Sequence, residues 1–230
     1  MVNVRTLIAA MILALIAMPV VALEKASSGK SSAGDYSMIG LRLGLWVDES
    51  NERPVSNITI DADLPSTSFF TEFYYDHRLT RAVMLELSMG IASRGDAVIR
   101  EGDDKYIGSI NLYPLLAQVK LTPLSGRSRA VFPYLLGGCG VVWGRQNVDY
   151  ITSSDPYYNP DRVNNTETAF VGVVGGGIDF SLSEQLGLNF STKYIPISFE
   201  GLLVGVRKYT GISFAVGVAY YLHKKDSRKP

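Results

Sequence analysis

Six charged residues lie within segments that otherwise alternate between apolar and small or polar side chains. Arg42, Glu86 and Lys193 each stand on the face opposite a continuous apolar row. The complete set is Arg42, Glu72, Glu86, Lys120, Asp179 and Lys193. Three cations and three anions that share one face of a sheet can pair, and an unpaired charge in a confined interior is costly. We therefore predict that these residues form an interior charge network rather than a catalytic centre.

Residues that could support other chemistry are scarce. The chain of 230 residues has two histidines, His77 and His223, and one cysteine, Cys139. One cysteine excludes an internal disulfide and a multi-cysteine metal site, and two histidines leave little material for histidine-based catalysis. Basic and acidic residues number 22 each, which argues against a nucleic-acid-binding protein. We expect no catalytic residue, no cofactor and no bound metal.

Three short motifs have simpler explanations than a binding site. Arg94-Gly95-Asp96 spells the integrin-binding tripeptide, but a tripeptide of common residues also arises by chance. Gly175-Gly176-Gly177 is followed by strand residues, whereas a phosphate-binding loop leads into a helix. The carboxylates of Asp61 and Asp63 could bind a divalent cation, although hard cations usually need more oxygen ligands than one pair offers.

Period-two alternation, the pattern of β-strands, continues along the chain after residue 24. In residues 212–222, for example, Phe214, Val216 and Val218 share one face and Gly217 lies on the other. The predicted strands are 36–47, 67–76, 82–92, 107–121, 131–144, 166–181, 186–194 and 212–222. Pro114 is expected to mark a bulge or a change in the phase of the alternation.

The length of these segments indicates a membrane-spanning barrel. They run for about ten to fourteen residues, whereas soluble strands average about five or six and membrane-spanning strands need about nine to eleven. Short turns alternate with longer loops at 48–66, 93–105, 145–165 and 199–209. We predict an all-β, eight-stranded antiparallel transmembrane β-barrel with both ends at the short-turn, periplasmic rim. A soluble lipocalin-like barrel would reverse the faces, and an ordinary sandwich with a wet face is the remaining alternative.

Aromatic residues gather near the ends of the predicted strands, where transmembrane barrels carry two interfacial girdles. The residues assigned to the girdles are Tyr36, Trp46, Tyr75, Trp143, Tyr194 and Tyr220.

The beginning of the chain reads as a cleavable signal peptide. Arg5 precedes an uncharged apolar run from Leu7 to Leu23, and Val20-Val21-Ala22 fits the small-residue rule for cleavage. An uncleaved anchor is the alternative. The predicted organisation is a signal peptide at 1–22, a flexible segment at 23–34, the barrel at 35–222 and a basic periplasmic tail at 223–230.

The chain resembles the small outer-membrane β-barrel family of the OmpA, OmpX and OmpW type. The resemblance rests on the signal peptide, on the 133–141 and 175–180 segments, on the turn at 181–185 and on the 186–194 and 211–222 strands. It covers residues 35–222 and specifies fold better than function. It departs from the family at the end of the chain, because a basic tail follows Leu222 where such barrels usually end on an aromatic residue.

The resemblance implies residence in the bacterial outer membrane. The expected partners are outer-membrane lipid and lipopolysaccharide, periplasmic chaperones and the barrel assembly machinery, with a host or surface ligand possible at the four long loops. The leading hypothesis is a non-enzymatic barrel with a plugged or narrow polar lumen that serves envelope integrity or surface interaction. The alternatives are an OmpW-like conduit for small solutes and a lipid A-modifying enzyme.

Overall fold

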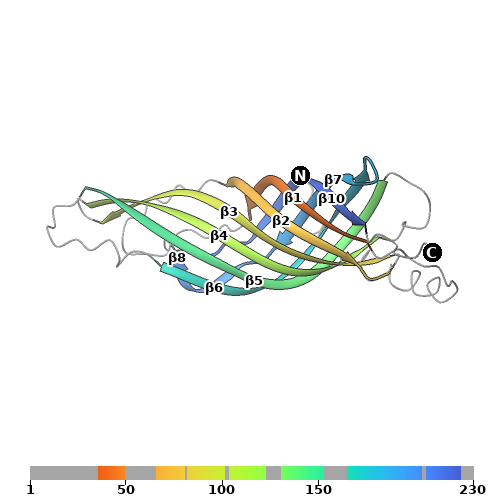
Figure 1. Ribbon diagram of the computed structural model, residues 1–230. Coiled ribbons are helices and arrows are strands. Elements are labelled where there is room, and N and C mark those ends of the chain that lie inside the picture. Colours follow the sequence, from red (N-terminus) through yellow and green to blue (C-terminus); the bar gives the residue numbers. More distant parts are fainter. Residues whose placement is uncertain are drawn as a thin grey trace, which may run out of the picture.

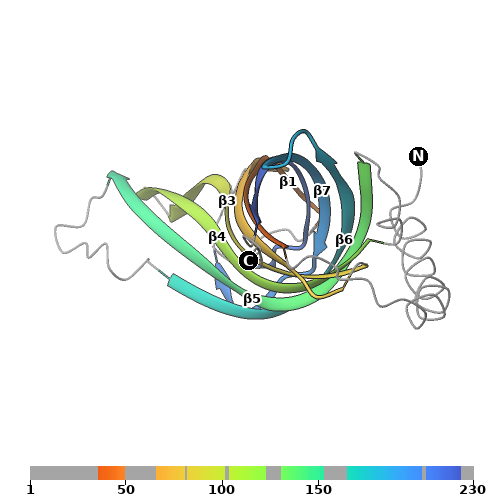
Figure 2. The same cartoon turned by 45° about the vertical axis from the view of Figure 1, so that its right-hand side comes forward.

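The chain folds into a closed antiparallel β-barrel of eight strands (Figures 1 and 2). The computed structural model describes residues 36–49, 66–80, 82–101, 104–122, 131–152, 165–203 and 206–223. The barrel strands are β1 (Tyr36–Asp48), β2 (Thr67–Arg78), β3 (Val83–Glu101), β4 (Asp104–Leu121), β5 (Val131–Thr152), β6 (Asn165–Ser181), β7 (Leu186–Ile195) and β10 (Gly211–His223). They pair in the order β1-β10-β7-β6-β5-β4-β3-β2, so the predicted all-β barrel with eight antiparallel strands is confirmed.

Both ends of the barrel sheet meet at one rim, because Tyr36 of β1 is the register partner of His223 of β10. The tight β2–β3 and β6–β7 turns lie at the same rim, which we call the short-turn rim. In these turns the Leu79 amide donates to the Val83 carbonyl and the Leu182 amide donates to the Leu186 carbonyl. The opposite end is the long-loop rim.

The strand registers define how far the sheet is staggered on closure. A path along paired residues from Phe170 on β6 passes through Val141, Leu115, Met89, Phe73, Leu41, Val218 and Leu188 and returns to β6 at Phe180. The start and the return differ by 180 − 170, or ten residues, which is the shear of the barrel. A staggered sheet tilts its strands, so side chains at one depth of the interior are not register partners.

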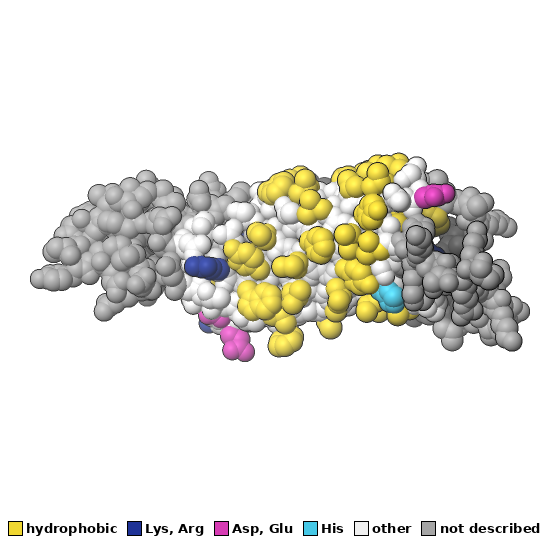
Figure 3. Space-filling view, in the orientation of Figure 1, with side chains coloured by type: hydrophobic (Ala, Val, Ile, Leu, Met, Phe, Trp, Pro, Cys, Tyr) yellow, Lys and Arg dark blue, Asp and Glu magenta, His cyan; other side chains and the backbone are white. Residues whose placement is uncertain are grey.

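The outward face of the strands is apolar around the barrel. Along β1, Leu41, Leu43 and Leu45 alternate with the buried Arg42 and the half-buried Gly44. Figure 3 shows apolar side chains covering the middle of the visible surface, with the charged side chains toward its ends. The belt residues that are between 43% and 60% exposed include Leu41, Leu43, Leu45, Phe69, Phe73, Leu87, Met89, Ile91, Leu115, Val119, Phe190, Phe214, Val216 and Val218. Such a belt needs an apolar solvent around it.

Four strands are much longer than a bilayer requires. β3, β4, β5 and β6 have 19, 18, 22 and 17 residues, whereas spanning takes about nine to eleven. The excess extends beyond the long-loop rim (Figure 1). The prediction that 93–105 and 145–165 are loops is therefore wrong in part, because strand pairing continues through Glu101, Asp104 and Thr152.

The segment predicted as a loop at 199–209 contains a small hairpin instead. β8 (Ser198–Leu203) and β9 (Val206–Lys208), which follow β7 and precede β10 in the chain, form a separate two-stranded sheet. The hairpin was missed because its inward residues, such as Phe199 and Leu203, are too few to give a clear alternating pattern.

The bulge expected at Pro114 lies elsewhere. Pro114 pairs in unbroken register with Val142 of β5, and the β3–β4 register stays constant past it. Proline lacks an N–H, so it interrupts a ladder bond without adding a residue. The register shift occurs between Ser93 and Asp96 of β3, at the end of the apolar belt.

Several predictions from the sequence lie outside the described residues. They are the signal peptide at 1–22, the segment at 23–34, most of the loop at 48–66 and the tail beyond His223. Among the described residues, no helix is long and apolar enough to cross a membrane.

A charge placed on the belt should be costly. Val216 and Leu43 are register partners on the outward face, so Val216→Arg or Leu43→Arg should destabilise the barrel by about 2–4 kcal/mol at the bilayer midplane. The measurement is a urea titration of folding in phospholipid vesicles, with Val216→Leu as the matched control. Equal stability of the arginine and leucine variants would contradict the assignment of this face to lipid.

Candidate functional site

The most distinctive site in the barrel is a group of charged side chains enclosed in the lower half of its interior, by which we mean the half nearer the short-turn rim. Arg42 of β1 is its centre and is fully buried. Its Nη1 donates to Glu72 Oε2 of β2 at 2.7 Å and to Glu86 Oε1 of β3 at 2.9 Å. Its Nη2 donates to Glu86 Oε2 at 2.8 Å. The guanidinium therefore binds the Glu86 carboxylate in bidentate fashion, the strongest geometry for such a pair.

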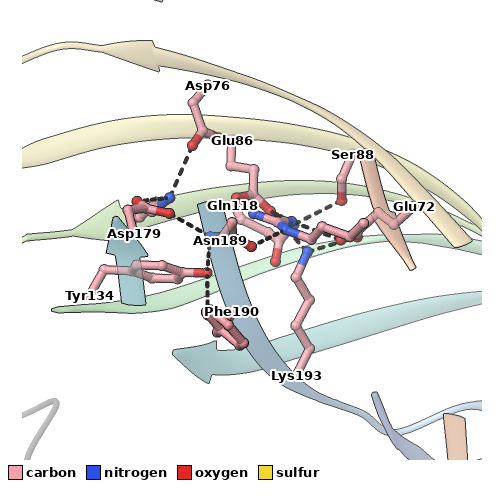
Figure 4. Close-up of polar contacts among 12 residues, drawn as sticks. Glu72, Asp76, Glu86, Ser88, Gln118, Tyr134, Asp179, Asn189, Phe190 and Lys193 are labelled. Atoms are coloured by element: carbon pink, nitrogen blue, oxygen red, sulfur yellow. Dashed lines mark hydrogen bonds and ion pairs between the residues drawn. The ribbon is translucent and has the colours of Figure 1, made fainter. Parts of the chain in front are cut away.

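Lys193 approaches the same two carboxylates from β7. Its Nζ donates to Glu72 Oε1 at 2.7 Å and to Glu86 Oε1 at 2.9 Å. Gln118 of β4 adds a third donor to Glu86, because its Nε2 lies 3.2 Å from Oε1. Two cations and two carboxylates from four strands thus neutralise one another in one layer (Figure 4).

Lys120 forms a second cluster closer to the short-turn rim. Its Nζ lies 3.1 Å from Asp76 Oδ2 of β2 and 2.7 Å from Asp179 Oδ2 of β6. Asp76 is fully buried and was missing from the network predicted from the sequence. The signal was present, because Asp76 continues the alternation of Glu72 and Tyr74 on the inward face.

Asn189 of β7 joins the two clusters (Figure 4). Its Oδ1 accepts from Arg42 Nε at 2.6 Å, and its Nδ2 donates to Asp179 Oδ1 at 2.5 Å and to Tyr134 Oη at 3.0 Å. Aromatic faces supply further contacts, since Arg42 Cζ lies 3.6 Å from the centroid of Tyr74 and Lys120 Nζ lies 3.9 Å from that of Tyr134. All six residues of the predicted network are therefore brought into contact, with Asp76 and Asn189 as additional members.

A glycine on the neighbouring strand makes room for the arginine. Gly217 of β10 is the register partner of Arg42. A Cβ atom at Gly217 would lie 2.7 Å from Arg42 Cγ and 2.6 Å from the Leu41 carbonyl oxygen. The small residue is required because the Leu41 carbonyl and the Cγ methylene of Arg42 fill the space beside it.

The upper half of the interior, nearer the long-loop rim, is apolar. This differs from the polar lumen expected from the sequence. Trp46 and Phe70 pack with ring centroids 5.9 Å apart. Around them lies a continuous cluster that includes Ala92, Ile110, Leu112, Leu116, Leu136, Val142, Val171, Val173, Ile195 and Ile197. This apolar cluster stands between the charge network and the long-loop rim.

The β8–β9 hairpin completes the apolar cluster. Phe199, Leu203, Val206 and Tyr209 are buried in it, and the Phe199 and Tyr209 rings lie 5.8 Å apart. The hairpin packs over β5, where a Cβ at Gly144 would meet Leu203 Cδ1 at 2.5 Å. It is fixed to β6 because the Gly201 amide donates to Glu167 Oε2 at 3.2 Å, and Asn165 Nδ2 donates to the Leu202 carbonyl at 3.2 Å.

The aromatic residues predicted for the girdles divide between the two faces. Tyr75, Trp143, Tyr194 and Tyr220 lie on the outward face of their strands. The assignment of Trp46 is wrong, because its side chain is fully buried in the apolar interior. Trp46 is four residues from Arg42 and therefore lies on the same, inward face of β1. The alternation thus predicts a buried side chain, and the position of Trp46 near a strand end was the weaker signal. The side chain of Tyr36 lies outside the described residues.

Arg94 is also turned inward, which removes the tripeptide Arg94-Gly95-Asp96 as a presented ligand. Its side chain is fully buried and forms an ion pair with Asp48 of β1. Ser68 Oγ of β2 lies 3.5 Å from Arg94 Nη1. This pair stands above the charge network and ties β1 and β2 to β3.

The charged side chains at the centre of the network are enclosed within the barrel. Arg42, Glu86 and Lys193 are at most 1% exposed. At the short-turn rim, a cavity of about 10 Å³ is lined by Met38, Arg78, Met84, Thr122, Phe132, Asp179 and Tyr221, which is roughly room for one water molecule. Among the described residues, no group of three or more histidine, cysteine or acidic side chains is arranged to hold a metal ion.

An apolar outer belt around an interior that holds buried charges defines an integral membrane β-barrel, because lipid tolerates that outer surface. The sequence matches the model of the family described as outer membrane protein beta-barrel domain over residues 8–221. The chain belongs to this family and resides in the bacterial outer membrane. Barrels of this kind have short periplasmic turns, so we expect the short-turn rim to face the periplasm.

Solved structures of small outer-membrane barrels share the fold at low sequence identity. OprG from Pseudomonas aeruginosa superposes with a TM-score of 0.52 at 18% identity, covering 84% of this chain and 97% of that one. Ail from Yersinia pestis, solved with the heparin analogue sucrose octasulfate, gives 0.50 at 14% identity, covering 82% and 99%. Neisserial surface protein A gives 0.50 at 13% identity, covering 83% and 99%. No curated protein matches the sequence.

Removing Glu86 should unbalance the network. Glu86→Gln would leave Arg42 and Lys193 with Glu72 as the one carboxylate they share, and leaving a buried charge uncompensated costs about 3–5 kcal/mol. Unfolding by urea in lipid vesicles measures the loss, with Glu184→Gln in the exposed β6–β7 turn as the control. Adding Lys193→Met should restore part of the stability. A double variant less stable than Glu86→Gln alone would contradict the pairing.

Proposed function

We propose that this protein is a non-enzymatic outer-membrane barrel with a plugged lumen, which contributes to envelope integrity and acts through its external surfaces. The proposal rests on the side chains that occupy the interior. The charge network lies toward the short-turn rim, and the apolar cluster lies toward the long-loop rim. A permanent aqueous path would have to displace both layers. Such a protein does not function as a general diffusion pore.

The surface beyond the long-loop rim is where an external ligand would be recognised. β3, β4, β5 and β6 extend there, and the hairpin braces β5 and β6 (Figures 1 and 2). Ail, a barrel of similar fold, has been solved with a heparin analogue, so this architecture can present a ligand-binding surface. We propose a host or surface ligand for the segments at 48–66, 93–105, 145–165 and 199–209, and lipopolysaccharide around them.

Biogenesis supplies the remaining partners. An exported barrel with so much apolar surface needs periplasmic chaperones and the barrel assembly machinery before it reaches lipid. The basic residues predicted for the periplasmic tail fit anionic partners on that side of the membrane.

A conduit for small solutes is the second candidate, because one observation favours it. β6 pairs with β7 only from Val174 to Ser181, and β7 ends at Ile195. The part of β6 toward the long-loop rim therefore has no barrel strand paired on that side, and the β8–β9 hairpin is fixed there through Glu167 and Asn165. A small apolar solute would enter there by displacing the hairpin, without crossing the charge network.

Modification of lipid A is less compatible with the structure. That chemistry would need a histidine near the outer leaflet, at the long-loop rim. His77 is near the end of β2, two residues before the turn residue Leu79, and therefore lies at the opposite end of the barrel.

Electrical recording separates a plugged barrel from a conduit. We expect the wild-type barrel in planar bilayers to add no steady conductance, and Arg42→Ala/Glu86→Ala combined with Trp46→Ala to raise leak conductance by opening both layers. Glu184→Gln serves as the control. Uptake of a small apolar solute into liposomes that contain the barrel tests the second candidate. Porin-like conductance of the wild type would overturn the proposal of a plugged lumen, and uptake above that of empty liposomes would favour the conduit.

A further inference from the structure

Three polar side chains form a hydrogen-bonded chain on the outside of the barrel, at the short-turn rim. Ser37 of β1 and His77 of β2 are register partners, and Ser37 Oγ lies 3.0 Å from His77 Nδ1. Tyr75 Oη donates to Ser37 Oγ at 3.0 Å. The Tyr75 and His77 rings stack with centroids 6.5 Å apart and planes inclined by 8°. Each member therefore fixes the position of the next.

The cluster lies where the apolar belt ends. One step toward the middle of the belt, Ile39 and Phe73 are outward-facing, and Phe73 is 48% exposed. To the sides, Leu85 is the register partner of His77, and Leu222 is that of Ser37. Figure 3 shows a histidine side chain at this edge of the apolar surface. This depth corresponds to the headgroups of the inner leaflet.

The other strands present apolar side chains at the same end. Val83 of β3, Leu121 of β4, Val131 of β5 and Leu186 of β7 occupy the outward positions nearest this rim. An interfacial girdle needs only an aromatic ring with one polar end, which Tyr75 alone would supply. Ser37 and His77 add hydrogen-bonding groups that a girdle does not need, which suggests a polar ligand at this one place.

The hydrogen-bond capacity of the cluster indicates the chemistry of that ligand. With a neutral imidazole, the Ser37 hydroxyl donates to Nδ1 and the remaining proton is on Nε2, which has no partner in the described part of the chain. With a protonated imidazole, Nδ1 donates to Ser37 and the serine proton becomes free. In either arrangement the cluster presents an outward donor that the Ser37–Tyr75–His77 contacts hold in place, and a phosphate oxygen is an acceptor that fits such a donor.

The neighbouring charged residues do not compete for this ligand. Asp76 is buried in the interior with Lys120, and Arg78 lines the internal cavity at the rim. The elements packed against His77 contribute Ser37 from β1 and Leu85 from β3.

We propose that Ser37, Tyr75 and His77 form a binding site for the phosphodiester group of an inner-leaflet phospholipid. Phosphatidylethanolamine and phosphatidylglycerol share this group, so either lipid can supply it. The site is independent of the lumen, and it would fix the depth of the β1–β2 edge of the barrel in the membrane.

Native mass spectrometry of the barrel, released from micelles that contain equal amounts of the two lipids, tests the proposal. Ser37→Ala removes the central hydroxyl, and His77→Phe keeps the ring stack while removing both nitrogens. Tyr220→Phe is the matched control, because Tyr220 is an outward rim tyrosine outside the cluster. A change in gel mobility on boiling verifies that each variant is folded.

We expect the wild type and Tyr220→Phe to retain one phospholipid about tenfold more strongly than the two cluster variants. Loss of both lipids together assigns recognition to the shared phosphate, and loss of phosphatidylglycerol alone assigns it to the anionic lipid. Equal retention by all four proteins would overturn the proposal. Release of lysophospholipid by the wild type, abolished in Ser37→Ala, would overturn it in favour of ester hydrolysis. Neither result depends on whether the lumen conducts.

Discussion

The bidentate contact between Arg42 and Glu86 is the interaction on which the interior of this barrel depends. It joins β1 to β3 across the lumen rather than along a ladder, and Lys193 brings β7 to the same carboxylate. Charges enclosed in this way have lost their water, and only mutual pairing makes their burial tolerable. The choice of side chains at neighbouring positions follows from that demand, from Gln118 as a further donor to the glycine that admits Arg42.

The location of these charges follows from the solvent outside. In a soluble barrel the interior is the natural place for apolar side chains, but here lipid takes them on the outer face. Polar residues are then free to occupy the interior, provided that each is paired. The upper interior shows that the exchange is incomplete. There Trp46, Phe70 and Leu116 directly follow the belt residues Leu45, Phe69 and Leu115, so apolar side chains line both faces of the sheet at that depth. Phe199 and Leu203 of the hairpin complete this apolar core.

Alternation along the strands was enough to predict much of this molecule. It gave the number of barrel strands, the outward belt and the face on which Arg42, Glu72 and Lys193 lie, because a period of two leaves only two faces. It could not give the contacts across the lumen. Arg42 and Glu72 are register partners, but Arg42 and Glu86 meet because a shear of ten residues brings non-neighbouring strands to one depth. Shear is a property of the closed sheet and is not encoded in any one segment.

The errors in loop assignment share a physical origin in the extension of the strands past the apolar belt. Polar segments such as 93–105 were assigned to loops because lipid-facing alternation ends there, yet strand pairing continues. Arg94 illustrates the consequence. Read as part of an exposed loop, it completes an adhesive tripeptide, whereas in a continuing strand its parity turns it toward Asp48 inside the barrel. The same parity that places Arg42 in the charge network therefore removes Arg94 from the surface, so the external ligand that we propose would be recognised by other residues.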